Sequence, residues 1–141
     1  MKNWQGFVDA LDPLRQDERG KVFELLTELF LQIDPIYRSK LKQVWHESNL
    51  PASVRHKLNL PSPDMGVDLV AEDTSGGYWA IQCKYHHDPS KNVTKSELNS
   101  FLDITTRRCR GKFKTLLAVS SAEMTTTRSG RIVNTRRSNA V

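Results

Sequence analysis

Residues 66–85 constrain this chain more than any other stretch. They read GVDLVAEDTSGGYWAIQCKY, two apolar runs separated by Gly76 and Gly77. A glycine pair between strand-like runs is a turn signal, so the segment is predicted to form a β-hairpin. An aspartate and a lysine inside such apolar strands are costly to bury without a partner, a metal or a function. Asp68 and Lys84 are therefore candidate functional residues.

The alternation of side chains along a strand groups these polar residues. On the second arm Gln82 and Lys84 share one face, whereas Cys83 lies on the other. Asp68 on the first arm completes a set of a carboxylate, an amide oxygen and an ammonium group. A structural salt bridge between Asp68 and Lys84 is the alternative explanation, although buried ion pairs are poor sources of stability.

The same residues resemble the active site of the Mrr-like restriction endonuclease domains, a branch of the PD-(D/E)XK nuclease superfamily. Those domains place a G-[VI]-D aspartate at the end of one strand and an [EQ]-x-K pair on the next. Residues 66–68 and 82–84 match these motifs. A closer likeness is to the N-terminal nuclease domain of type ISP restriction enzymes, which often reads D-x-G-[IV]-D, as residues 64–68 do here. The resemblance spans residues 15 to 120.

This resemblance implies a metal-dependent deoxyribonuclease that uses Mg²⁺, with Mn²⁺ as a substitute. Asp68 would be the principal metal ligand, helped by the amide oxygen of Gln82 and the main-chain carbonyl of Cys83. The Lys84 ammonium would reach the attacking water or the phosphate. Many relatives have a glutamate at the position of Gln82, so the neutral amide implies a weaker ligand.

Two further acids are implied less directly. Mrr-like domains carry a phenylalanine–glutamate pair in the first helix whose carboxylate reaches the metal site, and Phe23 and Glu24 match that pair. Helical periodicity alone, however, predicts that Glu24 lies opposite the buried stripe and is solvated. Asp64 is either part of the site or a turn residue beside Pro63.

The rest of the pattern predicts an α/β fold with a restriction-endonuclease-like αββαβ core, a central mixed sheet flanked by helices. Periodicity predicts helices at 18–32 and 36–45, and a helix from Thr94 or Ser96 to 108. Residues 46–65 are predicted to form a loop with room for one short turn of helix, and residues 115–120 a strand. The first helix is predicted to bury its apolar stripe, which consists of Val22, Leu25, Leu26, Leu29, Phe30 and Ile33. The third is predicted to bury Leu98, Phe101, Leu102 and Thr105. We expect a nuclease domain at 1–120 and a basic tail at 121–141, either disordered or a truncated continuation.

Composition is that of a soluble domain. The 141 residues are 38% hydrophobic and 26% charged, with no apolar run long enough for a membrane span and no secretory signal. Two cysteines form no disulfide framework, which favours a reducing cytoplasm. Together with His86 and His87, Cys83 and Cys109 also fail to match the spacing of a zinc site.

Charge is distributed unevenly along the chain. The net charge is +5, yet residues 107–137 hold nine lysines and arginines against one glutamate, a local charge of +8. Such asymmetry points to a polyanionic partner, and double-stranded DNA is the simplest one. A solvated helix end followed by a basic tail is the alternative. The predicted DNA-binding residues are Arg107, Arg108, Arg110, Lys112, Arg128 and Arg131.

Three functions remain open at this point: a metal-dependent endonuclease of the restriction type, a nucleic-acid-binding module that cleaves nothing, and a docking domain of a larger helicase-type enzyme. The embedded Asp68 and Lys84 favour the first, because a binding module has no need of a buried aspartate. No helicase or methyltransferase motif occurs in the sequence. Such modules would have to lie on a longer or a separate chain.

Overall fold

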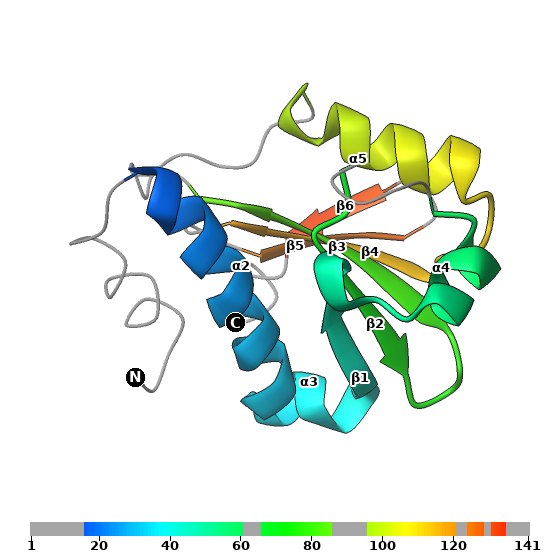
Figure 1. Cartoon of the computed structure of the whole chain (residues 1–141), viewed down its shortest axis with the longest axis horizontal. Helices are drawn as coiled ribbons and strands as arrows, with labels where there is room; N and C mark the ends of the chain where they lie inside the picture. Colours follow the sequence, from blue (N-terminus) through cyan, green and yellow to red (C-terminus); the bar gives the residue numbers. More distant parts are fainter. Residues whose placement is uncertain (1–15, 61–65, 86–95, 121–123, 129–130, 135–141) are drawn as a thin grey trace.

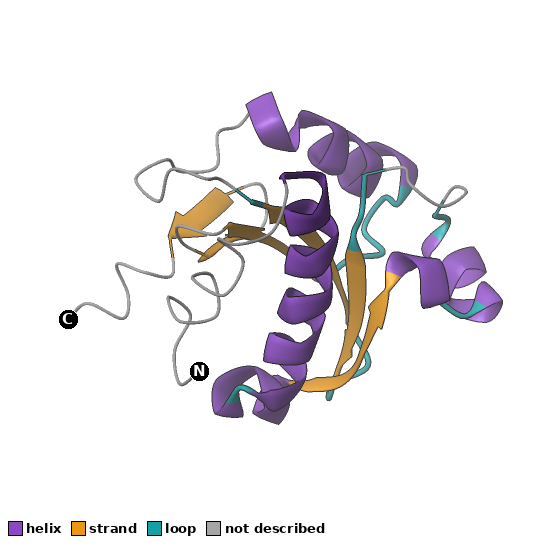
Figure 2. Ribbon diagram, turned by 60° about the vertical axis from the view of Figure 1, so that its left-hand side comes forward, coloured by secondary structure: helices purple, strands orange, loops and turns teal. Residues whose placement is uncertain are grey.

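The chain folds around one mixed β-sheet with helices on both faces (Figures 1 and 2). The computed structural model describes residues 16–60, 66–85, 96–120, 124–128 and 131–134. Within this part the sheet has six strands in sequence order: β1 (Leu41–His46), β2 (Leu69–Asp73), β3 (Tyr78–Lys84), β4 (Thr115–Ser120), β5 (Met124–Arg128) and β6 (Arg131–Asn134). Only the β3–β4 pair is parallel among these strands.

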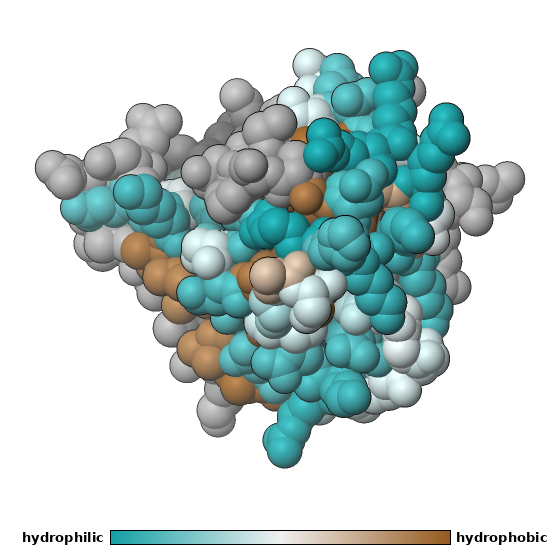
Figure 3. All heavy atoms as spheres, turned by 45° about the vertical axis from the view of Figure 1, so that its right-hand side comes forward, coloured by the Kyte–Doolittle hydropathy of each residue, from teal (hydrophilic) through white to brown (hydrophobic). Residues whose placement is uncertain are grey.

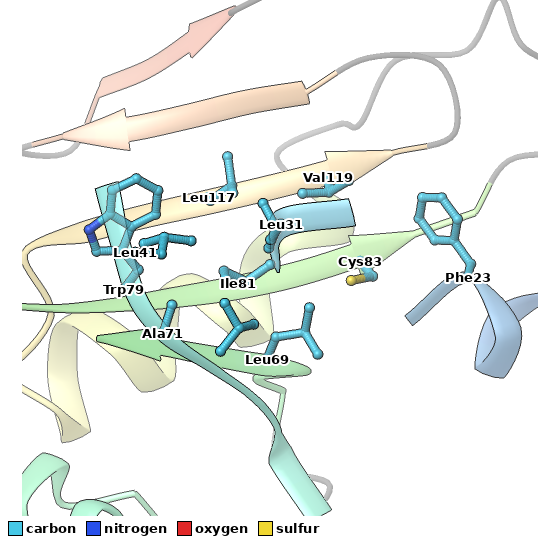
Figure 4. Packing of buried hydrophobic residues seen from close by; sticks show 11 residues of the cluster. Phe23, Leu31, Leu41, Leu69, Ala71, Trp79, Ile81, Cys83, Leu117 and Val119 are labelled. Carbon is cyan, nitrogen blue, oxygen red and sulfur yellow. The ribbon is translucent and has the colours of Figure 1, made fainter. Parts of the chain in front are cut away.

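The helices form two layers that bury the two faces of the sheet. One layer consists of α2 (Gln16–Ile33) and α3 (Pro35–Lys40). The other consists of α4 (Ala52–Leu58), η2 (Ser96–Leu98), α5 (Asn99–Asp103) and the π-helical turn η3 (Ile104–Arg108). The 3₁₀ turn η1 (Glu47–Asn49) joins β1 to α4. Figure 4 shows the first core, in which side chains of β2, β3 and β4 pack beneath Phe23 and Leu31 of α2.

The predicted hairpin is confirmed. β2 and β3 pair antiparallel with Leu69 opposite Ile81, and the turn passes through Gly76, whose φ is +88°. A side chain at Gly77 would lie 2.8 Å from Lys114 Cδ, so that position is sterically restricted to glycine unless Lys114 moves.

The predicted last helix and last strand are also confirmed. Leu98, Phe101 and Thr105 are buried as expected, and the helical segment returns the chain so that β4 runs parallel to β3. The order α2–β2–β3–α5–β4 is the predicted αββαβ core.

The helix predicted at 36–45 is wrong. The chain is helical only to Lys40 and then forms β1, which pairs antiparallel with β2. A bulge between Leu41 and Gln43 breaks the two-residue alternation, so the buried side chains Leu41 and Val44 stand three residues apart. In the sequence that spacing looks helical. The segment predicted as loop after residue 46 contains η1 and α4.

The predicted buried stripe of the first helix is half right: Val22, Leu26 and Phe30 pack against the core, whereas Leu25, Leu29 and Ile33 are exposed. The fully buried residues of α2 are Phe23, Thr27 and Leu31, whereas Leu25 and Leu29 are exposed. Thr27 fits this interior because its hydroxyl donates to the Phe23 carbonyl at 2.7 Å. Figure 3 shows a band of hydrophobic side chains at the surface, and the exposed large apolar residues are Leu25, Leu29, Ile33 and Ile36. The rotation of α2 moves Glu24 from the expected solvent face to the edge of the sheet.

The segment after residue 120 extends the sheet. β5 pairs antiparallel with β4, and β6 pairs antiparallel with β5. The domain boundary at residue 120 stays a prediction. Among the described residues, no helix has both the length and the apolar character that crossing a membrane requires.

Asp73 closes the hairpin turn, and its removal tests how far stability depends on that turn. Its buried carboxylate accepts from the N–H groups of Ser75 and Gly77, from the Ser75 hydroxyl, from Trp79 Nε1 and from Lys114 Nζ. Asp73→Ala should lower the free energy of unfolding by about 2–4 kcal/mol, because five donors lose their acceptor. Denaturant unfolding measures this. The matched Asp103→Ala, at an exposed carboxylate, should change it by less than about 0.5 kcal/mol; equal effects would contradict the role assigned to the turn.

Candidate functional site

Asp68 lies at the mouth of the hairpin, immediately before β2. Its main-chain N–H donates to the Ile81 carbonyl at 3.0 Å, and its own carbonyl accepts from Glu47 N–H at 2.9 Å. Its side-chain Oδ2 accepts from the main-chain N–H of Cys83 at 2.8 Å. The carboxylate is thus held against β3 at Cys83, the residue between Gln82 and Lys84.

The electrostatic surroundings of Asp68 are unusual for a carboxylate. Burial raises the pKa of Asp68 to about 6, and the negative charge of Glu24 adds to the rise. The hydrogen bond from Cys83 and the positive charges of Lys84 and His46 act in the opposite direction but do not cancel it. Asp68 therefore senses the charges of three other ionisable side chains: Glu24 of α2, His46 of β1 and Lys84 of β3.

Gln82 carries an unsatisfied polar atom. Its side chain is 8% exposed, and its Oε1 has no hydrogen-bond partner within the described part of the chain. A buried carbonyl oxygen without a partner costs free energy, so its retention calls for an explanation such as a bound ion. Lys84, two residues further on the same strand face, is partly buried.

Glu24 reaches this site from α2 in a way that periodicity did not predict. Its Oε1 lies 3.0 Å from His46 Nε2, and both side chains are about three-quarters buried, with exposed fractions of 25% and 23%. His46 ends β1 and pairs with Leu69, the residue after Asp68. The sequence reasoning missed His46 because it predicted no strand there. The β-prone pair Val44 and Trp45 just before it was the available signal.

The described residues contain no group of three histidine, cysteine, aspartate or glutamate side chains arranged to hold a metal ion. A metal site built from the described residues alone would therefore need other oxygens as well. Gln82 Oε1 and main-chain carbonyls are the available ones, with the Asp68 carboxylate beside them.

Comparison with known proteins agrees with this geometry. A family model described as restriction endonuclease, of the Mrr catalytic type, matches residues 32–139. The chain belongs to the Mrr-like restriction endonuclease family. The family match confirms the predicted resemblance and, together with the structural match given below, the predicted fold class. Nucleases of the PD-(D/E)XK type generally use divalent metals.

A solved structure supports the same assignment. The ATP-dependent type ISP restriction-modification enzyme LlaBIII bound to DNA matches 79% of this chain, with 32% sequence identity and a TM-score of 0.57. This restriction endonuclease domain spans only 6% of that chain. No curated protein matches the sequence.

Several predicted site residues lie elsewhere. Residues 107–112 are exposed at Arg107, Arg108, Arg110 and Lys112 and precede β4, so they flank the start of β3 rather than its Lys84 end. The two ends of β3 are about 20 Å apart, from six steps of strand rise. Asp64 lies outside the described residues, as do the side chains of Arg128 and Arg131.

The two cysteines of this restriction endonuclease domain lie in different layers. Cys83 packs in the core beneath α2, as Figure 4 shows, whereas Cys109 packs in the core beneath α5. Both are buried, free thiols. They cannot share a metal ion across the sheet, which agrees with the spacing argument against zinc. His86 and His87 lie outside the described residues.

The raised pKa of Asp68 has a consequence for stability. Because the native pKa of about 6 lies above the ordinary value of 3.8, the native state holds the proton more tightly than the unfolded chain. Stability is therefore lost as pH rises from about 4 through 6. In metal-free buffer, Asp68→Asn should raise the free energy of unfolding at pH 8 by about 2 kcal/mol and leave it nearly unchanged at pH 4.

Urea unfolding at the two pH values measures this difference. Asp103→Asn is the matched control, since Asp103 is 58% exposed and pairs only with a surface arginine within the described residues. A gain of equal size at pH 4 and pH 8 would mean that ionisation of Asp68 is not its cause.

Proposed function

We propose that this domain hydrolyses phosphodiester bonds of double-stranded DNA with a divalent metal ion, Mg²⁺ or Mn²⁺ in its place. The observation that carries the proposal is Gln82 Oε1, buried without a hydrogen-bond partner among the described residues, beside the partly buried Asp68 carboxyl group, whose pKa is raised. Such oxygens, costly to bury, suit a hard cation that prefers oxygen ligands. The residues present therefore fit a metal ion of this class.

In this proposal the ligands are the Asp68 carboxylate, Gln82 Oε1 and the Cys83 main-chain carbonyl, with Glu24 contributing from α2. A bound divalent ion would lower the pKa of a water molecule and offset charge on the phosphate. Asp68 must be ionised to act as a ligand, so binding should weaken as pH falls below about 6.

Lys84 is the proposed source of positive charge for the transition state. It follows Gln82 by two residues on the same strand face, and its charge acts on Asp68. A lysine ammonium can donate to the phosphate oxygens or hold the attacking water. Its partial burial strengthens these interactions relative to a fully solvated lysine.

DNA is the proposed substrate because the family consists of restriction endonucleases and the similar solved enzyme is described as bound to DNA. We propose that helicase and methyltransferase modules on a longer or separate chain select the DNA, and that the enzyme acts in the cytoplasm. The exposed cations at 107–112, with Arg128 and Arg131, are proposed to contact phosphates away from the cleavage site without reading sequence.

A non-cleaving DNA-binding module is the second candidate. The observation that favours it is the neutral Gln82, which supplies one negative charge less than a glutamate would. Both candidates bind DNA, but only the first loses a measurable activity when Asp68 or Lys84 is changed.

Plasmid nicking with Mg²⁺ and with chelator separates the two. Wild type should convert supercoiled DNA to nicked or linear forms only with metal, and Asp68→Asn and Lys84→Ala should each reduce the rate by about 10²-fold or more. Asp103→Asn and Lys42→Ala, at exposed positions, are the matched controls and should nick at the wild-type rate. Nicking that survives either site substitution in a folded protein would rule out the catalytic assignment.

Gln82→Glu tests whether the amide oxygen is a ligand. An ionised carboxylate should bind Mn²⁺ about tenfold more tightly than the neutral amide, because hard cations favour charged oxygens. Calorimetric titration measures the affinity, and Gln43→Glu at an exposed position of β1 controls for added charge. Affinity equal to that of wild type would show that residue 82 does not touch the metal.

A further inference from the structure

His46 connects three parts of the site through both of its ring nitrogens. Nε2 lies 3.0 Å from Glu24 Oε1 on α2. Nδ1 lies 2.8 Å from Ser48 Oγ and 3.2 Å from the main-chain nitrogen of Ser48. The ring is therefore held at one edge by the turn that follows β1 and faces the helix with the other edge.

These contacts determine where the ring proton lies. A main-chain N–H can only donate, so Nδ1 must accept from Ser48 N–H, and the serine hydroxyl can donate to it as well. In the neutral ring the proton then lies on Nε2, which donates it to the Glu24 carboxylate. The turn after β1 thus selects the tautomer that binds Glu24.

The same short turn, residues 46–48, also holds the main chain of Asp68. Glu47, between His46 and Ser48, donates its main-chain N–H to the Asp68 carbonyl at 2.9 Å. The Glu47 side chain is itself anchored by a 2.5 Å contact with Arg55 of α4. Residues 46–48 therefore bind the main chain of one carboxylate residue and the side chain of the other.

We propose that His46 is a positioning residue that holds the Glu24 carboxylate toward the metal site while the adjacent main chain holds Asp68. This inference rests on the function proposed above. A glutamate on a helix surface has several free rotamers, and a hydrogen bond from a fixed ring removes most of that freedom. Hydrogen bonds that orient ligating carboxylates commonly contribute 10–100-fold to metal affinity.

The direct test compares three variants by Mn²⁺ titration and nicking. His46→Ala should weaken Mn²⁺ binding about tenfold and lower kcat, with the KM for DNA unchanged, because the histidine orients a ligand and touches no DNA. His46→Gln keeps an N–H donor near the position of Nε2 and should recover affinity to within about threefold of wild type. His56→Ala, an exposed histidine on α4, is the matched control and should change nothing.

Two further measurements keep the test decisive if His46→Ala is destabilised. Ser48→Ala, at an exposed position, leaves the ring in place and removes one donor to Nδ1, so it should cause a smaller loss of affinity in the same direction. A double-mutant cycle with Glu24→Ala should be strongly non-additive, since each single change removes the same interaction.

The outcomes separate the two proposals. If wild type binds Mn²⁺ and nicks DNA, Asp68→Asn does neither, and His46→Ala equals wild type, the positioning role is wrong and the nuclease proposal stands. Additive effects of His46 and Glu24 would also overturn the positioning role. If wild type neither binds Mn²⁺ nor nicks DNA, the nuclease proposal fails and the positioning role fails with it.

Discussion

The hydrogen bond from the Cys83 main-chain N–H to Asp68 Oδ2, 2.8 Å long, joins the two arms of the hairpin at its open end. It sets the carboxylate beside Gln82 and Lys84, and those residues cannot move independently because six of the seven residues of β3 are buried. β3 lies between β2 and β4 with helices on both faces, so the candidate site is built on a central and almost fully buried strand.

The site is costly to the isolated fold. Burial raises the pKa of Asp68, and Gln82 Oε1 lacks a partner within the described residues. Asp73, in the same hairpin, is more deeply buried but accepts from five donors. The two aspartates differ in their partners: Asp73 is satisfied by the protein and stabilises the turn, whereas Asp68 accepts one hydrogen bond, from Cys83 N–H, and is the residue assigned to the proposed metal ion. Unmet groups of this kind concentrate at functional sites.

The segment that connects the two helical layers at the site is short. His46, Glu47 and Ser48 bond to α2, to the Asp68 main chain and to one another, and Arg55 ties Glu47 to α4. A shift of α2 would therefore move His46 through its contact with Glu24, and the adjacent Glu47 would transmit the movement to the Asp68 main chain. This arrangement explains how an acid on a helix and an acid at a strand end can occupy one site of a restriction endonuclease domain.

The hairpin, the last helix and strand, and the family could all be predicted from local patterns, because glycine turns, alternating faces and a short apolar run depend on neighbouring residues alone. The same patterns also grouped Asp68, Gln82 and Lys84, since strand periodicity is strict. Local patterns did not reveal which face of α2 is buried, that residues 41–46 form a strand, or that Glu24 contacts His46. Those outcomes depend on contacts between distant segments: the bulge in β1 makes its burial look helical, and Thr27 can be buried only because its hydroxyl bonds to the helix backbone.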